Sequence, residues 1–256
     1  MDLRLDPALA EGYASGAQRA RVLTEAWFAR HAYCPACGSG GVGRHGNNRP
    51  AADFFCARCG HDFELKSGKR RIGDRVPDGA YDSMVARLDA PDAPHLCLMA
   101  YDARALAVRD LLVVPRHVVT PRAVERRKPL APTARRAGWV GCNLVLRDLP
   151  EAGRVFLVRD GIAEPKERVL ATWRKTAFLD GAGSGARGWL LDVWRCVEDL
   201  GRAEFSIADA YGFEARLSRL YPGNRNVRPK IRQQLQVLRD NGRLVFLGGG
   251  TYRVVG

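Results

Sequence analysis

The first 180 residues alternate between amphipathic stretches and short, wholly apolar runs. The apolar residues of a first predicted helix, over about 17–32, are Val22, Leu23, Trp27 and Phe28. A second stripe at helical spacing predicts a helix over 78–88. Wholly apolar runs, which are typical of buried strands, occur at 95–101, 111–114 and 155–158. Helices interleaved with buried strands predict a mixed α/β sheet core.

A different pattern follows a stretch rich in Gly and Ser at 181–188, which predicts a flexible linker. Apolar stripes beyond it predict three helices at 189–200, 206–220 and 229–240. Ser206 and Asp209 have the spacing of a capping signal at the start of the second helix.

Two short predicted strands, 243–246 and 252–255, flank three consecutive glycines at the C-terminal end. Three helices followed by a two-stranded wing are the order of a winged-helix domain. We therefore expect one domain at 1–180, a linker at 181–188 and a winged helix at 189–256.

Two Cys-x-x-Cys pairs lie inside the first domain. Cys34 and Cys37 are separated by eighteen residues from Cys56 and Cys59, and the chain has seven cysteines. This spacing is typical of a structural Zn²⁺ site, in which four thiolates leave no coordination position open. The second pair lies between two predicted short strands. The sequence thus predicts a zinc module at about 34–59 whose second half forms a turn.

Charged residues on those two strands, 51–55 and 62–66, form a candidate catalytic set. Glu64 and Lys66 are two residues apart and project from one face, on which Asp53 of the partner strand can converge. Paired carboxylates suit Mg²⁺ or Mn²⁺, which polarises a phosphate and lowers the pKa of bound water. The alternative is three charges on a solvated hairpin. Apolar neighbours that place the set at a core edge are Phe54, Phe55, Phe63 and Leu65.

The charge balance bears on the partner. The chain has 41 Lys and Arg against 28 Asp and Glu, a net charge of +13. Such an excess favours a polyanion, because neutralised phosphates release counterions and so supply affinity. The alternative is that the basic residues only form a solvated surface, as in proteins from an organism whose proteome is rich in arginine. The net charge alone does not decide between these two interpretations.

Asp53 and Glu64-Leu65-Lys66 resemble the PD-(D/E)xK nuclease site, with Glu25 on the first helix as the further carboxylate that such sites often carry. One departure is that the proline is Pro50 and not the residue before Asp53. The zinc module, the segment 127–143 and the helix segment 230–240 resemble the DpnI-type restriction endonucleases. This similarity extends over nearly the whole chain.

The resemblance implies a type II, Mg²⁺-dependent endonuclease that cuts double-stranded DNA at GATC sites when the adenine carries an N6-methyl group. Asp53, Glu64 and the Leu65 carbonyl would hold Mg²⁺, and Lys66 would activate water. Both domains would read the methylated site. The alternatives are a non-catalytic zinc-ribbon and winged-helix regulator, which the intact Asp, Glu and Lys disfavour, and a nuclease of different modification specificity.

Reading N6-methyladenine requires an apolar surface against the methyl group in the major groove. Trp139 could supply it, with Arg135, Arg136 and Asn143 beside it for phosphates or base edges. A tryptophan buried in the core is the alternative.

On the last helix, Ile231, Leu235 and Leu238 form the apolar stripe. Residues assigned to positions off this stripe are Lys230, Arg232, Gln233, Gln234 and Gln236. Gln pairs with adenine and Arg with guanine, so these residues suit a major-groove helix, with Arg225 and Arg228 as phosphate contacts. The alternative is a solvated helix face, which the overall charge and the order of the elements disfavour.

The start of the chain resembles no signal peptide, and no apolar run approaches the roughly 18 residues of a spanning helix. We expect a soluble monomer in the prokaryotic cytoplasm, with adenine-methylated DNA as its partner and no membrane association.

Overall fold

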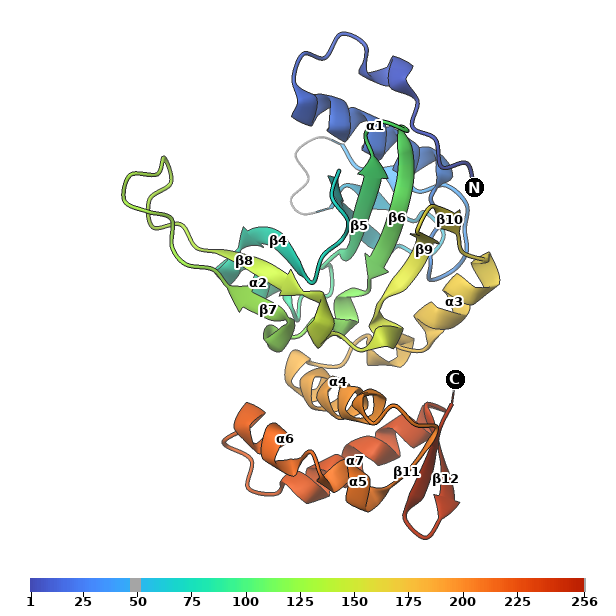
Figure 1. Cartoon of the computed structure of the whole chain (residues 1–256), viewed down its shortest axis with the longest axis vertical. Coiled ribbons are helices and arrows are strands. Elements are labelled where there is room, and N and C mark those ends of the chain that lie inside the picture. Colours follow the sequence, from blue (N-terminus) through green and yellow to red (C-terminus); the bar gives the residue numbers. More distant parts are fainter. Residues whose placement is uncertain (47–51, 256) are drawn as a thin grey trace. The chain divides into compact units, whose positions relative to one another are not determined.

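The computed structural model describes residues 1–46 and 52–255, so Pro50 and Ala51 lie outside the described residues. The chain divides into two compact units, Met1–Gly181 and Ala182–Gly256, and Figure 1 labels the elements of each. In the part of the chain described, no helix combines the length and apolarity that a membrane span needs.

A seven-stranded sheet forms the centre of the first unit, in the order β1-β2-β3-β5-β6-β9-β10. Its strands are β1 (Gly43–Arg44), β2 (Phe54–Phe55), β3 (Asp62–Gly68), β5 (His95–Asp102), β6 (Ala107–Val114), β9 (Val155–Arg159) and β10 (Ile162–Ala163). Neighbours are antiparallel except β3 and β5, which run parallel. The buried strands predicted from apolar runs are confirmed, and together with the helices they give the predicted mixed α/β core.

Helices α1 (Gly16–His31) and α3 (Lys166–Arg174) contribute to one buried cluster on the sheet. Its large side chains are Leu23, Trp27, Phe28, Phe54, Phe63, Met99, Tyr101 and Trp173. Because Phe63 and Leu65 join this cluster, the alternate positions Glu64 and Lys66 of β3 project from the opposite face. Short 3₁₀ helices connect the elements, at Pro7–Ala10, Arg116–Val118, Pro121–Ala123, Leu146–Asp148, Glu151–Gly153 and Ala177–Leu179.

A second, three-stranded antiparallel sheet has the order β4-β8-β7. Its strands are β4 (Arg75–Ala80), β8 (Gly141–Val145) and β7 (Val124–Arg126), and α2 (Tyr81–Arg87) follows β4 directly. The prediction of a helix over 78–88 is wrong at its start, because Asp78 lies in β4 opposite Cys142. Pro77 and Gly79, which are uncommon in strands, hide β4 from a pattern-based reading.

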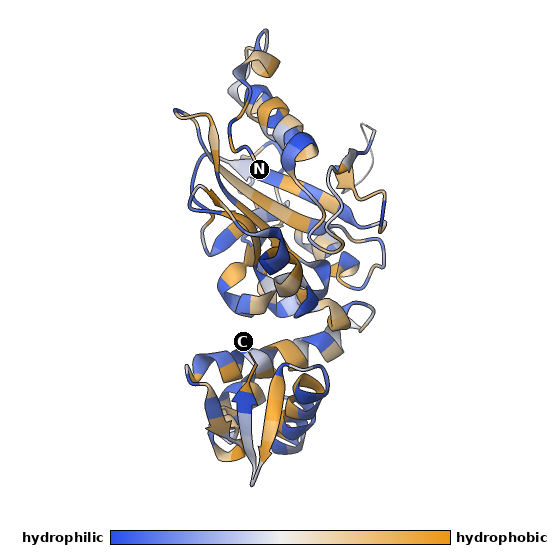
Figure 2. Cartoon of the chain, turned by 90° about the vertical axis from the view of Figure 1, so that its right-hand side faces the viewer, coloured by the Kyte–Doolittle hydropathy of each residue, from blue (hydrophilic) through white to orange (hydrophobic). Residues whose placement is uncertain are grey.

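The second unit has the predicted winged-helix order, with one added strand. Its elements are α4 (Ser184–Asp199), β11 (Glu204–Ser206), α5 (Ile207–Tyr211), α6 (Glu214–Leu220), α7 (Val227–Asp240), β12 (Leu244–Gly248) and β13 (Thr251–Val254). The strands form a sheet in the order β11-β13-β12. In Figure 2 the helices mix hydrophobic and hydrophilic positions, as expected of elements with one face on a core.

Two details of this unit differ from the expectation. The stretch 181–188 is for the most part not a linker: α4 begins at Ser184, and Arg187 and Gly188 are buried. Arg187 donates to the carbonyl of Ala182, and a Cβ at position 188 would lie 3.2 Å from the Tyr221 hydroxyl. Gly188 therefore allows the close approach of Tyr221.

The predicted helix at 206–220 is divided into α5 and α6, because Gly212 caps the end of α5. The capping signal itself is confirmed. Ser206 Oγ accepts from the Asp209 N–H at 3.2 Å, and the Asp209 carboxylate accepts from the Ser206 N–H at 2.7 Å.

Candidate active site

The four paired cysteines come together as the sequence predicts. Among the described residues, they are the one group of at least three Cys, His, Asp or Glu side chains whose ligand atoms all lie within 4.8 Å of one another. Cys34 Sγ lies 3.5 Å from Cys59 Sγ, and Cys37 Sγ lies 3.6 Å from Cys56 Sγ. These distances approach the roughly 3.8 Å edge of a tetrahedron with Zn–S bonds of about 2.3 Å.

The backbone around the sulfurs suits thiolates. The N–H groups of Ala36 and Cys37 donate toward Cys34, and those of Arg58 and Cys59 donate toward Cys56. Burial still raises the pKa of Cys34 well above its usual value and that of Cys59 to about 11. Burial acts in the same direction on Cys56, but the hydrogen bonds from the Cys59 and Arg58 N–H groups outweigh it and lower the pKa of Cys56. Four clustered sulfurs with amide donors fit a structural zinc ion, whose charge would favour the thiolate form of the remaining thiols.

His61, which follows the second cysteine pair, is partly buried. Its Nδ1 lies 3.1 Å from Cys59 Sγ. Its ring packs against those of His95 and Trp173, with centroids at 4.8 and 5.8 Å. Burial lowers the pKa of His61, so the neutral ring links the cysteine cluster to the core of the sheet.

The turn formed by Cys56–Cys59 joins β2 to β3 and so sets how Asp53 meets β3. Phe54 pairs with Phe63 in the antiparallel register, which brings Asp53 opposite Glu64. The Asp53 N–H donates to the Phe63 carbonyl at 2.9 Å. Its carboxylate Oδ2 accepts from the Leu65 N–H at 2.8 Å. Asp53 is thereby fixed beside the strand that carries Glu64 and Lys66.

Lys66 lies between two carboxylates, only one of which the sequence identifies. Its Nζ is 2.8 Å from Glu64 Oε1 and 2.8 Å from Asp78 Oδ1. Glu64 and Lys66 are thus brought together as predicted. Asp78 comes from β4 of the second sheet. The sequence pattern places it at the start of a predicted helix, because Pro77 and Gly79 conceal the strand, so nothing in the pattern marks Asp78 as a site residue.

The ionisation of the site follows from burial and from its own charges. Burial raises the pKa of Glu64, and the negative charges of Asp78 and Asp53 add to this against the effect of Lys66. Burial also disfavours the Lys66 ammonium, but the carboxylates of Glu64 and Asp78 outweigh it and raise the pKa of Lys66. Lys66 is therefore a cation at neutral pH, and the crowded carboxylates would be relieved by a further cation.

Glu25, the predicted additional carboxylate, is engaged elsewhere in this state. It is buried in α1, and Arg21 Nε donates to its Oε1 at 2.6 Å. Arg44 of β1 also pairs with it. The hydrogen bond to Glu25 raises the pKa of Arg21, and the negative charge of Asp53 adds a smaller effect in the same direction.

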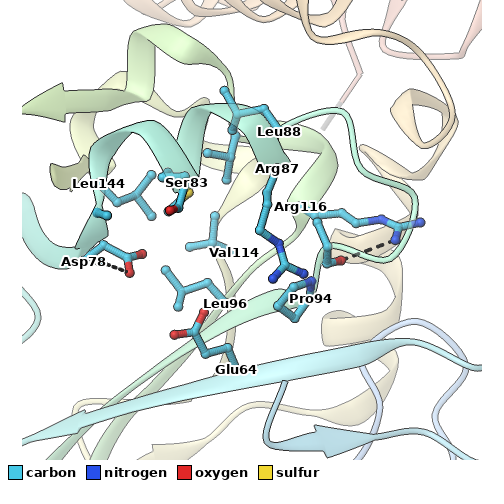
Figure 3. Close-up of a pocket in the computed structure, with 15 residues that line it drawn as sticks. Glu64, Asp78, Ser83, Arg87, Leu88, Pro94, Leu96, Val114, Arg116 and Leu144 are labelled. Carbon is cyan, nitrogen blue, oxygen red and sulfur yellow. Dashed lines mark hydrogen bonds between the residues drawn. The ribbon is translucent and has the colours of Figure 1, made fainter. Parts of the chain in front are cut away.

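A cavity of about 250 Å³ adjoins the site. Glu64 and Asp78 lie on its wall, and Leu96, Val114 and Leu144 form much of its apolar lining. Figure 3 shows Arg87 extending from α2 into this cavity toward the side of Glu64. Arg87 is a second residue that the sequence gave no reason to single out, because it follows an ordinary amphipathic stripe.

Residues 127–140 form a long hairpin loop between β7 and β8 that projects from the first unit (Figure 1), and residues 141–143 already belong to β8. Backbone pairing continues beyond the strands, with Leu130 N–H donating to the Trp139 carbonyl at 2.9 Å. Trp139 is half-buried and outside the core, and Arg136 stacks over its ring at 4.7 Å. Arg135 is exposed.

Asn143 belongs to the base of this hairpin. It lies in β8, where its side-chain amide donates to Glu125 Oε1 of β7 at 2.9 Å. Arg75 of β4 binds the same carboxylate. In this state Asn143 therefore links the two strands that carry the loop, and its contact with DNA stays a prediction.

The predicted DNA contacts on α7 fall into two groups, those whose side chains reach the surface and one that is buried. Arg232, Gln233 and Gln236 are exposed, and Lys230 Nζ donates to Gln233 Oε1 at 2.8 Å. The placement of Gln234 off the apolar stripe is wrong. It is buried, because it lies three residues from Ile231 and four from Leu238 on the same helix face.

The residues before and at the start of α7 also differ. Arg225 is exposed. Arg228 Nε donates to Glu214 Oε2 of α6 at 2.7 Å, and its guanidinium lies 5.2 Å from the centre of the Tyr211 ring. Arg228 therefore joins the helices of the unit, whereas Arg225 has no such engagement in the contacts described here.

Comparison with known families accounts for almost the whole chain. The DpnI model, described as the Dam-replacing family, matches residues 1–182. A second model, described as the Dam-replacing HTH domain, matches residues 185–254.

Proposed function

The chain belongs to the Dam-replacing family, and from this premise we propose that it is a type II restriction endonuclease specific for N6-methyladenine in GATC sites. Family membership makes it an endonuclease with a DNA-binding winged helix. The observation that supports the hydrolytic assignment most directly is the convergence of Asp53, Glu64 and Lys66 at the turn set by the cysteine cluster.

The residues present fit a hard divalent cation. Asp53 and Glu64 lie on neighbouring strands, burial and neighbouring negative charges raise the pKa of Glu64, and Asp78 Oδ2 is buried close by. Asp53, Glu64 and the Leu65 carbonyl would hold Mg²⁺ or Mn²⁺. When bound, such an ion polarises the scissile phosphate and lowers the pKa of a bound water.

Lys66 supplies a fixed positive charge to the reaction. Its pKa is raised above the usual value, so the ammonium form is present at neutral pH. An ammonium held by two carboxylates can donate to the attacking water or to a phosphoryl oxygen, and it offsets the negative charge that grows in the transition state. Glu25 enters the proposal as a residue that positions Arg21 near Asp53.

Specificity lies in two elements, each fitted to DNA. The projecting hairpin presents Trp139 with Arg135 and Arg136, and α7 presents Arg232 and Gln233 on its exposed face. The net charge of +13 adds sequence-independent affinity for phosphates.

The experiment that tests the function uses plasmid DNA prepared with and without adenine methylation, incubated with the protein and Mg²⁺. Cleavage of the methylated plasmid alone is expected. Cleavage of both plasmids would indicate a nuclease of different specificity. Binding without cleavage in Mg²⁺ and in Mn²⁺ would indicate the non-catalytic regulator.

Replacing Trp139 by alanine is expected to weaken discrimination between methylated and unmethylated sites. Contact with one methyl group contributes about 0.8 kcal/mol, or roughly fourfold, and a palindromic GATC site carries two such groups. The ratio of binding constants for methylated and unmethylated duplexes should therefore fall by about 4- to 15-fold. Arg135→Ala, a change on the same loop, should weaken binding to both duplexes alike. An unchanged ratio in Trp139→Ala would remove Trp139 from methyl recognition.

Replacing Arg232 by alanine is expected to reduce DNA affinity by about tenfold, because a base-edge or phosphate contact contributes on the order of 1–3 kcal/mol. Arg239 is the matched control: it is exposed in the last turn of the same helix and paired with Asp240. Equilibrium binding to a methylated duplex without divalent cations measures both variants. Equal losses in the two would show that α7 contributes general charge and no specific contact.

A further inference from the structure

The ammonium group of Lys66 is paired with two carboxylates that come from different sheets. Glu64 is its neighbour on β3, and Asp78 reaches it from β4 of the second sheet, each at 2.8 Å from Nζ. Either carboxylate would neutralise the lysine alone. Charge balance alone therefore does not explain why Asp78 is present as a second partner of Lys66.

Asp78 is itself held firmly. Its Oδ1 accepts from the Gly79 N–H at 2.6 Å and from Lys66. Its side chain is only 9% exposed, and no donor among the described residues reaches its buried Oδ2. Leaving a buried carboxylate oxygen without a partner is destabilising, which is typical of groups retained for function.

The two carboxylates have different surroundings. Glu64 shares the site with Asp53, its cross-strand neighbour, and is one of the proposed cation ligands. Asp78 sits across the site on β4, beside the cavity into which Arg87 extends. If Glu64 were the only partner of Lys66, the ammonium would lose its hydrogen bond when Glu64 coordinates a metal cation.

We propose that Asp78 is a positioning residue, which fixes Lys66 Nζ at the reaction centre independently of Glu64. This inference rests on the proposed endonuclease function. Strand β4 would then contribute to catalysis, because its Asp78 carboxylate orients Lys66 of the seven-stranded sheet.

The first test measures catalysis in the full chain with Asp78→Asn and Asp78→Ala, and with Asp82→Asn as a control on the exposed start of α2. Single-turnover cleavage of a methylated duplex should slow by about 10- to 100-fold in Asp78→Ala and less in Asp78→Asn, which keeps an acceptor oxygen. The dissociation constant for DNA and the half-saturating Mg²⁺ concentration should stay within about twofold.

Three results would overturn the proposal. An unchanged cleavage rate in Asp78→Ala would remove Asp78 from catalysis. A large rise in the half-saturating Mg²⁺ concentration would make Asp78 a cation ligand. Parallel losses of DNA binding and of melting temperature would make it merely structural.

The second test is independent of activity. Thermal melting without divalent cations is compared for the wild type, Asp78→Asn, Lys66→Met and the double variant. Asp78→Asn should lower the melting temperature in the wild type but raise it in the Lys66→Met background, where Asp78 is a buried charge without its cation. Equal shifts in both backgrounds would overturn the Lys66–Asp78 link, even if no DNA is cut and the proposed function fails.

Discussion

Replacing Lys66 by alanine is expected to slow cleavage of methylated DNA by about 100- to 1,000-fold, the effect of removing one preorganised donor from a developing negative charge. DNA binding should change little, since Lys66 is one of 41 basic residues and is already paired with Glu64 and Asp78. Single-turnover rates and equilibrium binding to the same duplex separate the two effects.

Lys69→Ala is the matched control, because Lys69 is an exposed lysine just beyond the end of β3. It should cleave at nearly the wild-type rate. A Lys66→Ala protein that cleaves as fast as this control would exclude Lys66 from the reaction. Thermal melting of both variants shows whether a loss of cleavage results from unfolding.

Disrupting the cysteine cluster is expected to inactivate the protein by unfolding the first unit around its active site. Cys56→Ser removes one of the four thiols, and the second cysteine pair forms the turn that joins β2 to β3. Because structural zinc contributes directly to folding, the melting temperature of the first unit should fall by more than about 10 °C. Zinc content should fall from one ion per chain to much less than one.

Cys196→Ala provides the control, since Cys196 lies in α4 of the second unit, away from the cluster in sequence. Its zinc content should stay at one ion per chain. Elemental analysis and differential scanning calorimetry measure the two quantities. Full zinc content, or an unchanged melting transition, in Cys56→Ser would contradict a zinc-dependent fold.

Local patterns were sufficient to predict most elements of the fold. The run 96–101 is apolar throughout because β5 is buried on both faces, so its composition alone marks the strand. The capping pair Ser206 and Asp209 predicts where α5 begins. The paired cysteines predict their own cluster, because their spacing is set by the chemistry of one ion.

What the sequence did not reveal depends on contacts between elements distant in the chain. Asp78 reaches Lys66 only because the fold brings β4 of the second sheet to β3 of the first, and no periodicity encodes that arrangement. Gln234 was misplaced because a polar residue on an apolar helix face is indistinguishable by type from an exposed one. The glycines at 181–188 suggest a linker, whereas α4 begins at Ser184 and Gly188 packs closely against the Tyr221 hydroxyl.

We propose above all that Asp53, Glu64 and Lys66 converge to form a hydrolytic centre directed to methylated DNA. The most direct measurement is the single-turnover rate of Mg²⁺-dependent strand cleavage in short duplexes with one GATC site, either methylated on adenine or unmethylated. We predict cleavage of the methylated duplex and none of the unmethylated duplex over the same period. Equal rates on both duplexes, or no cleavage of either by the zinc-loaded protein in Mg²⁺ or Mn²⁺, would contradict the claim.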